Sequence, residues 1–205
     1  MPKIRLTKNE LKLQKDALRR FQRYLPMLQL KKKQLQLEII KVHQAIREVG
    51  KNIENLRNVV IQWVDVFAQG FPVGEKFRLK EIKTGQDNIA GLDLPKYLGV
   101  EFEQEEYDLL RTPLWVDKGI EVIKKMIAYK SELLVYRKQI DILKEELRIA
   151  TQRVNLFEKV KIPEARENIR VIQIYLGELK TAEVVRGKIA KAKLEEKRKL
   201  VAYDS

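Results

Sequence analysis

The sequence predicts a mainly α fold: a long antiparallel two-helix left-handed coiled coil with a small β-hairpin or irregular insert at its turn end. Three observations support this prediction. A hydrophobic repeat of alternating three and four residues runs through the first third of the chain, a similar repeat runs through its second half, and most of the Gly and Pro lie between them. A helix turns every 3.6 residues, so a 3.5-residue repeat keeps one apolar seam against a partner helix only if the two helices supercoil left-handedly.

The first repeat continues without a slip for about eight heptads. Its seam positions are apolar except for Gln14 and Lys32. They are Leu11, Gln14, Leu18, Phe21, Leu25, Leu28, Lys32, Leu35, Ile39, Val42, Ile46, Val49, Ile53, Leu56, Val60, Trp63 and Phe67. A helix from near Thr7 to near Ala68 would be roughly 90 Å long. Compact domains rarely contain such a helix, so we expect an elongated helical pair.

The second repeat slips by one residue near Ile162-Pro163. It occupies Met126, Tyr129, Leu133, Tyr136, Ile140, Leu143, Leu147, Ala150, Val154 and Phe157, and resumes at Ile162, Ala165, Ile169, Ile172, Leu176 and Leu179. A one-residue insertion changes the local winding of a coil. Pro163 lacks an amide donor, which favours a kink or a local bulge, and Pro26 has the same potential in the first helix. The plainer alternative is that both prolines are tolerated on an outer face.

The pattern changes between the two repeats, which divides the chain into helix 1–69, insert 70–113 and helix 114–205. Within the insert, residues 77–83 and 97–105 alternate like strands, and the turn-forming residues 84–88 lie between them. We therefore expect a small β-hairpin or irregular knob. Its core is too small to be stable alone, so we expect it to pack on the end of the helix pair or on another chain.

The two helices should overlap over most of their length. If the second begins near Leu114 and pairs antiparallel with the first, the overlap ends near residue 178, which agrees with the end of the seam at Leu179. The remaining residues are helix-prone and basic, and they would extend as a lone helix by roughly 30 Å. A lone helix is marginal in water unless something surrounds it.

Composition and charge exclude several protein classes. The 205 residues include no Cys, which rules out disulfides and thiolate metal sites and favours the cytoplasm. No stretch reads as a signal peptide or a membrane span. The net charge is +13, and both terminal segments are basic: 12 Lys and Arg against three Asp and Glu in residues 1–41, and eight against three in residues 180–199. Such a surface attracts a polyanion or an acidic protein, although a solvated helix exterior is the commoner explanation of a charge run.

No catalytic or cofactor-binding pattern is present in the sequence. The glycines form no phosphate-binding loop, and the single histidine, His43, sits beside the seam and cannot build a zinc site. Glu101, Glu103 and Glu105 would share a strand face and could bind a hard cation, but a dock for a basic partner is the better interpretation. Among the aromatic residues, Phe71 and Phe77 are candidates for a protein interface. We therefore expect a non-enzymatic protein without cofactor or metal.

Three parts of the sequence resemble the D subunit of the V-type and A-type rotary ATPases. Residues 151–158 (TQRVNLFE), followed by Ile162-Pro163, Ile169, Ile172 and Leu176, resemble the C-terminal helix of that family. Thr7, Lys8, Leu18, Leu30-Lys31-Lys32-Lys33 and Leu35 look like its first helix, and Asn88-Ile89-Ala90-Gly91, Leu94-Pro95 and Thr112-Pro113 look like its central insert. The segment Val184-Val185-Arg186-Gly187 departs from the family pattern, and the insert is short.

The resemblance implies a non-catalytic rotor subunit of the central stalk, cytoplasmic and peripheral to the membrane. Its implied partners are the A-type and B-type subunits of the catalytic ring, the small F-type stalk subunit and a funnel-like subunit on the membrane ring, without nucleic acid and without membrane insertion. The residues expected to contact partners are Arg153, Arg186, Lys188, Lys191, Lys193, Phe71, Phe77, Glu101 and Glu103. A nucleic-acid-binding coiled coil and a generic scaffold or homodimer remain as alternatives.

Overall fold

Helix α1 begins at Lys8 because Thr7 caps it. The Oγ1 of Thr7 accepts a hydrogen bond from the backbone N–H of Glu10 (3.2 Å), and its carbonyl accepts one from Leu11 (3.0 Å). A Thr followed three residues later by Glu is the capping-box pattern that starts a helix. The helix then continues across Pro26, which is exposed, to Ile61.

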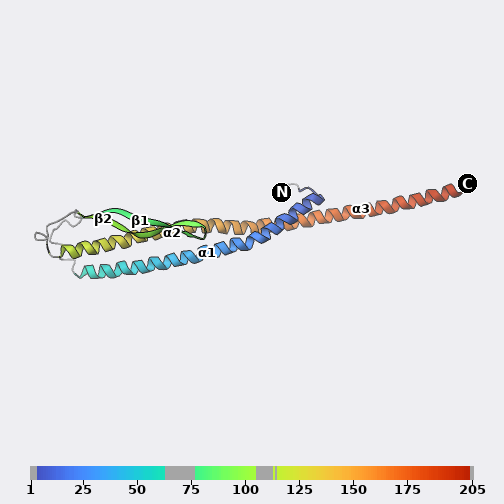
Figure 1. Cartoon of the computed structure of the whole chain (residues 1–205). Helices are drawn as coiled ribbons and strands as arrows, with labels where there is room; N and C mark the ends of the chain where they lie inside the picture. The colour runs from blue at the N-terminus through green and yellow to red at the C-terminus, as the bar shows by residue number, and fades with distance from the viewer. Residues whose placement is uncertain (1–3, 63–76, 105–112, 114, 204–205) are drawn as a thin grey trace. The chain divides into compact units, whose positions relative to one another are not determined.

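The computed structural model describes residues 4–62, 77–104, 113 and 115–203. The elements are α1 (Lys8–Ile61), β1 (Phe77–Ile89), β2 (Leu92–Gln104), α2 (Val116–Leu156), the π-helical turn η3 (Phe157–Lys161) and α3 (Ile162–Tyr203), labelled in Figure 1. The chain forms two compact units, one from Met1–Gln29 with Thr151–Ser205 and the other from Leu30–Ala150. The prediction of a mainly α fold with a small two-stranded insert is confirmed.

The seam predicted along α1 is confirmed as the side of the helix that packs. Every described seam residue from Leu11 to Val60 is buried or half-buried, including the polar Gln14 and Lys32. Trp63 and Phe67 lie outside the described residues. The 3.5-residue repeat predicted this result because it holds one stripe of side chains on one face over many turns.

In the unit formed by the chain ends, α1 pairs antiparallel with η3 and α3. The rings of Phe21 and Phe157 lie 5.3 Å apart, and Asn168 Nδ2 donates a hydrogen bond to Gln14 Oε1 (3.3 Å). The polar seam position Gln14 thus finds a polar partner at the same level.

The predicted one-residue slip in the second repeat is confirmed as the turn η3. The N–H of Ile162 donates to the carbonyl of Phe157, five residues back instead of four. The wider turn accommodates the extra residue, so Val154 before it and Ile162, Ala165 and Ile172 after it are all buried. A single π-turn thereby keeps the seam on one face.

In the other unit, α2 packs against α1 on one side and against the β-hairpin on the other. Lys31 on α1 forms an ion pair with Glu146 on α2 (2.7 Å). Leu35 of α1, Leu143 and Ala150 of α2, and Leu94 of β2 form one buried cluster. A second buried cluster joins Phe77 of β1 to Val116 and Ile120 of α2.

The hairpin turns at Ala90-Gly91, not at residues 84–88 as the turn-forming residues indicated. Ala90 and Gly91 both have positive φ (55° and 75°), and Ile89 pairs with Leu92 across them. Two positive φ values in a two-residue loop match the twist of a hairpin. Asn88 Nδ2 also donates to Asp93 Oδ1 (2.7 Å) beside the turn. Residues 84–88 instead extend β1, so both strands are longer than the alternation indicated.

The hairpin lies along α2, as Figure 1 shows, whereas the sequence indicated packing on the end of the helix pair. Ser131, Val135 and Gln139 form a second buried stripe of α2, four residues apart, outside the predicted seam. Gln139 Nε2 donates to the carbonyl of Pro95 at 2.5 Å. The heptad seam follows a single apolar stripe and therefore gave no sign of this second face, which combines a small, an apolar and a polar residue.

Candidate partner-contact surfaces

The C-terminal part of α3 carries four of the predicted contact residues. Arg186, Lys188, Lys191 and Lys193 are all exposed, and α3 remains helical around them. Apolar side chains on the same stretch are exposed too, namely Val184, Val185, Ile189 and Leu194. An exposed segment that mixes Lys and Arg with aliphatic side chains offers both charge and apolar area to a partner.

Arg153 lies in the last turn of α2, between the exposed Gln152 and the buried Val154. Its side chain is exposed, so the helix presents it away from the seam. This position is compatible with a partner contact, which stays a prediction.

The acidic pair Glu101 and Glu103 lies on β2, where the register places Glu101 opposite Glu81 and Glu103 opposite Arg78. Glu101 forms an ion pair with Lys83, and Glu103 is the register partner of Arg78. The hydrogen bond from Lys83, followed by its positive charge, lowers the pKa of Glu101, and the same contact raises the pKa of Lys83. The acidic face is therefore partly neutralised within the hairpin, which weakens its attraction for a basic partner.

Phe77 is largely buried, while Phe71 lies outside the described residues. The Phe77 side chain is 7% exposed and packs against Val116 and Ile120. Its ring meets Phe102 edge-on, with centroids 6.1 Å apart. Phe77 thus packs within its unit, and little of its surface remains for a partner.

The described residues contain no cluster of three or more His, Asp or Glu that could hold a metal ion. His43 is exposed on α1. Within the described part of the chain, none of the helices combines the length and the apolar character needed to cross a bilayer.

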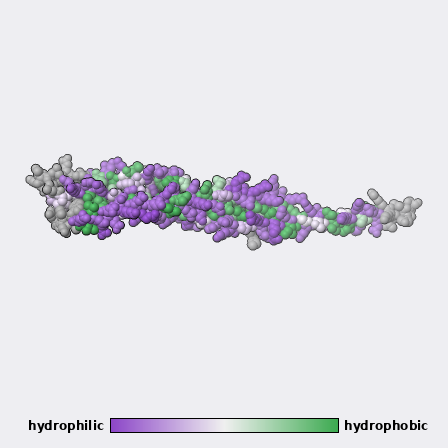
Figure 2. Space-filling model, turned by 90° about the horizontal axis from the view of Figure 1, so that it is seen from below, coloured by the Kyte–Doolittle hydropathy of each residue, from purple (hydrophilic) through white to green (hydrophobic). Residues whose placement is uncertain are grey.

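A groove between α1 and α2 was not indicated by the sequence. It has a volume of about 500 Å³ and is lined by Lys33, Gln36, Leu37, Ile39, Ile40 and Leu147. We call it the open groove. Figure 2, which views the molecule from below, shows apolar patches that interrupt a mostly hydrophilic surface.

Lys33 lines the open groove, and further basic side chains recur at heptad intervals along the two helices. On α1 they are Lys33 and Arg47, with Ile40 midway, and on α2 they are Lys130, Arg137 and Lys144. All five are exposed, and none forms an ion pair with another described residue. Seven residues make almost two full turns, so each row stays on one side of its helix.

Known proteins match the chain along nearly its whole length. The family model for the D subunit of ATP synthase matches residues 10–192. A V-type ATP synthase D subunit from Borreliella burgdorferi is 49% identical over 197 residues, covering 96% of this chain and 98% of that protein. Proteins of the same name from Chlamydia felis and Chlamydia pneumoniae are 32% and 33% identical, covering 95% and 94% of this chain and 95% and 93% of their own lengths. This chain therefore belongs to the D-subunit family of ATP synthases.

Proposed function

We propose that this chain is the central-stalk rotor subunit of a V-type or A-type rotary ATPase, which transmits torque between the catalytic head and the membrane ion-translocating ring. The observation that carries the proposal is the family match over residues 10–192, together with relatives named as the D subunit of V-type ATP synthase. Helix 1–69, insert 70–113 and helix 114–205 would act as one rotor body.

The seam supports this role because torque must pass through side-chain packing. In each unit α1 is held to an antiparallel partner by apolar contacts, with Leu35 and Leu143 fully buried in one unit and Ile172 in the other. Two helices packed along a continuous seam resist twisting better than one helix does. The outer faces carry exposed charges. Such a surface can slide past several similar partners, because no large side chain is buried in a pocket of any one of them.

The proposed partners are the A-type and B-type subunits of the ring, the small F-type stalk subunit and the funnel-like subunit next to the membrane. The exposed basic stretch Arg186–Lys193 would enter the ring, where each interface would contact a different side of the rotor. Such contacts would couple the rotor angle to the nucleotide sites, because each contact contributes a coupling free energy between two distant sites. The chain would work on the cytoplasmic side, peripheral to the membrane.

The test is reconstitution of the ATPase with and without this chain. We expect the chain alone to hydrolyse no ATP, and the complex to lose the coupling of hydrolysis to ion transport when the chain is absent. Leu147→Asp should prevent assembly, because it places a carboxylate beside the cluster of Leu35, Leu94 and Leu143. Full coupling in a complex assembled without this chain would refute the proposal.

Lys193→Glu provides a matched surface variant. Lys193 is exposed, so its replacement should leave the melting curve of the chain unchanged and alter only coupling in the complex. Circular dichroism of the chain and proton or sodium transport by the complex measure the two effects separately. A lowered melting temperature would contradict the solvent-exposed placement of Lys193.

A further inference from the structure

We propose that two polar contacts, Lys31–Glu146 and Gln14–Asn168, fix the axial register in which α1 pairs with the antiparallel helix beside it. We call them the register contacts. One lies in each unit, and their action does not depend on the rotor role. They select one register among several that the apolar seam permits.

The first observation is that the apolar seam does not define a single register. Leu35 of α1 shares one buried cluster with Leu143 and Ala150 of α2, which lie seven residues apart. The second repeat carries an apolar or aromatic residue at every heptad step from Met126 to Leu179. A slide of α1 by one heptad would therefore exchange apolar neighbours for other apolar neighbours, and it would move the helix by about 10 Å. Burial of the seam alone would tolerate such a slide.

The second observation is that few polar contacts cross from α1 to its partner helix. Lys31 Nζ lies 2.7 Å from Glu146 Oε1, and Asn168 Nδ2 donates to Gln14 Oε1 at 3.3 Å. The other ion pairs of these helices join residues of the same helix. Between residues 126 and 203, no further side-chain hydrogen bond or ion pair joins the partner helix to the described part of α1.

The third observation is that the register contacts coincide with the two polar positions of the α1 seam. Gln14 is one of these positions, and Lys31 directly precedes the other, Lys32. The Gln14 amide is also oriented, because its Nε2 donates to Glu10 Oε1 at 2.8 Å and a carboxylate only accepts hydrogen bonds. Its oxygen therefore remains for the donor on α3. The seam thus departs from apolar residues at the two levels where a polar contact crosses to the partner helix.

A slide of one heptad would break both register contacts. In one direction, Lys31 would come level with Arg153, which has the same charge. The Asn168 amide would then come level with the ring of Phe21. In the other direction, Lys31 would come level with Gln139, which already donates to the hairpin. A half-buried amide or charge without a partner raises the free energy of the shifted register. In coiled coils, a polar position inside an apolar seam fixes the register in this way, at a cost in stability.

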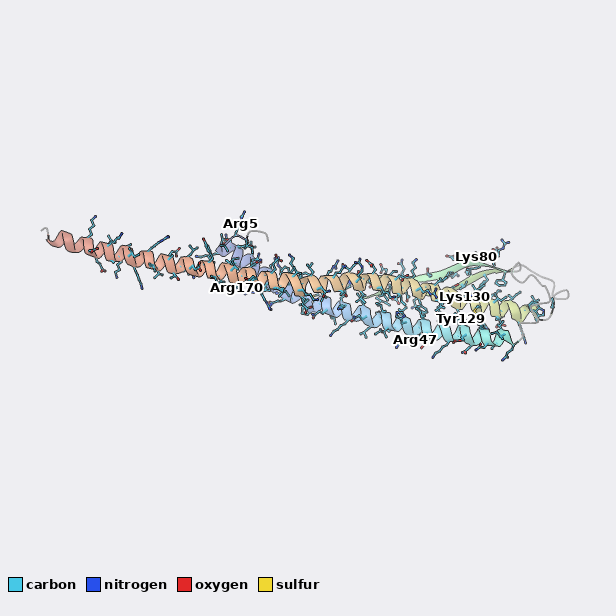
Figure 3. All side chains as sticks on the ribbon, turned by 180° about the vertical axis from the view of Figure 1, so that it is seen from behind. Arg5, Arg47, Lys80, Tyr129, Lys130 and Arg170 are labelled. Atoms are coloured by element: carbon cyan, nitrogen blue, oxygen red, sulfur yellow. The ribbon has the colours of Figure 1, made fainter. Side chains whose placement is uncertain are left out.

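The experiment measures the distance between two spin labels on the full chain by pulsed electron paramagnetic resonance. The chain has no native cysteine, so Arg47→Cys and Lys130→Cys place one label on α1 and one on α2. Both residues are exposed, and Figure 3 shows each on its helix. A slide of one heptad displaces the labels by about 10 Å along the helix axis, which this method resolves. We expect one narrow distance in the labelled chain that keeps both register contacts.

The decisive variant replaces the four residues of the register contacts by Leu, and we call it the four-leucine variant. Circular dichroism should show that it remains helical. It should give at least two label distances, because the apolar seam then permits more than one register. Restoring Lys31 and Glu146 in this variant should return the single distance. The matched control places Leu at four exposed positions outside the seam and should keep the single distance. These positions are Gln22, Lys51, Asp141 and Gln173.

A single unchanged distance in the four-leucine variant would overturn the proposal, because other features would then fix the register. Loss of its helical signal would also overturn it, because the register contacts would then supply stability and not register. Two distances in the variant with Lys31 and Glu146 restored would show that this ion pair does not select a register. Two distances in the control would count against the proposal in the same way, because added Leu alone would then permit the slide.

Discussion

Leu143→Ala tests the packing that holds α1, α2 and the hairpin together. Leu143 is 0% exposed and belongs to one buried cluster with Leu35 of α1, Leu94 of β2 and Ala150 of α2. Removing three buried carbon atoms costs about 2.4 kcal/mol in transfer free energy. The residual cavity adds up to about 1.5 kcal/mol, because contacts from three elements limit its collapse. We therefore expect the free energy of unfolding to fall by about 3–4 kcal/mol.

The assay is urea unfolding of the full chain followed by far-ultraviolet circular dichroism, with Leu134→Ala as the control. Leu134 lies on the same helix but is 57% exposed, so the same replacement should change the free energy of unfolding by less than about 0.5 kcal/mol. If Leu143→Ala costs less than about 1 kcal/mol, or no more than Leu134→Ala, then the cluster does not carry the packing that we infer from it.

Three further changes test the π-turn, the hairpin contact and the hairpin charges. Val160 is exposed within η3, and its deletion should convert the π-turn to α-helix while both halves of the seam stay in phase. The helical circular dichroism signal should therefore persist. A large loss of helicity would contradict this interpretation. Gln139→Leu should lower the free energy of unfolding by about 1–3 kcal/mol, because the Pro95 carbonyl loses its donor, and a urea titration that matches the wild type would show that water replaces it. Glu101→Gln should lower the free energy of unfolding only at pH values between the lowered pKa of Glu101 and the raised pKa of Lys83. The ion pair is lost as the pH falls through the first value and as it rises through the second. A stability difference from the wild type that persists in strong acid would refute the assignment.

The sequence predicted the features that depend on periodicity. The seam from Leu11 to Val60 could be read directly, because a helix converts spacing along the chain into position around its axis. The slip before Ile162 predicted an inserted residue for the same reason, and η3 is the local structure that absorbs it. The family resemblance followed from motif residues in three segments and agrees with the family match over residues 10–192.

The candidate contact surfaces could be predicted only in part. The exposure of Arg186 to Lys193 follows from a basic segment beyond the end of the seam. Phe77 illustrates the opposite case, since an aromatic residue in a short strand gives no indication of whether a helix will cover it, and here Val116 and Ile120 do. The acidic pair on β2 also looked free in the sequence, but Lys83 forms an ion pair with Glu101 from a diagonal position, and the strand register places Arg78 opposite Glu103.

The sequence alone determined the long helices, the seam along which they pair and the position of the extra residue, because these features depend on the spacing of apolar side chains within one helix. Only the tertiary structure decided that the hairpin lies along α2, held by Leu94 and by the contact of Gln139 with Pro95. It also decided that the open groove remains between α1 and α2. Both outcomes depend on which surfaces from distant parts of the chain meet, and spacing within a single helix does not encode that choice.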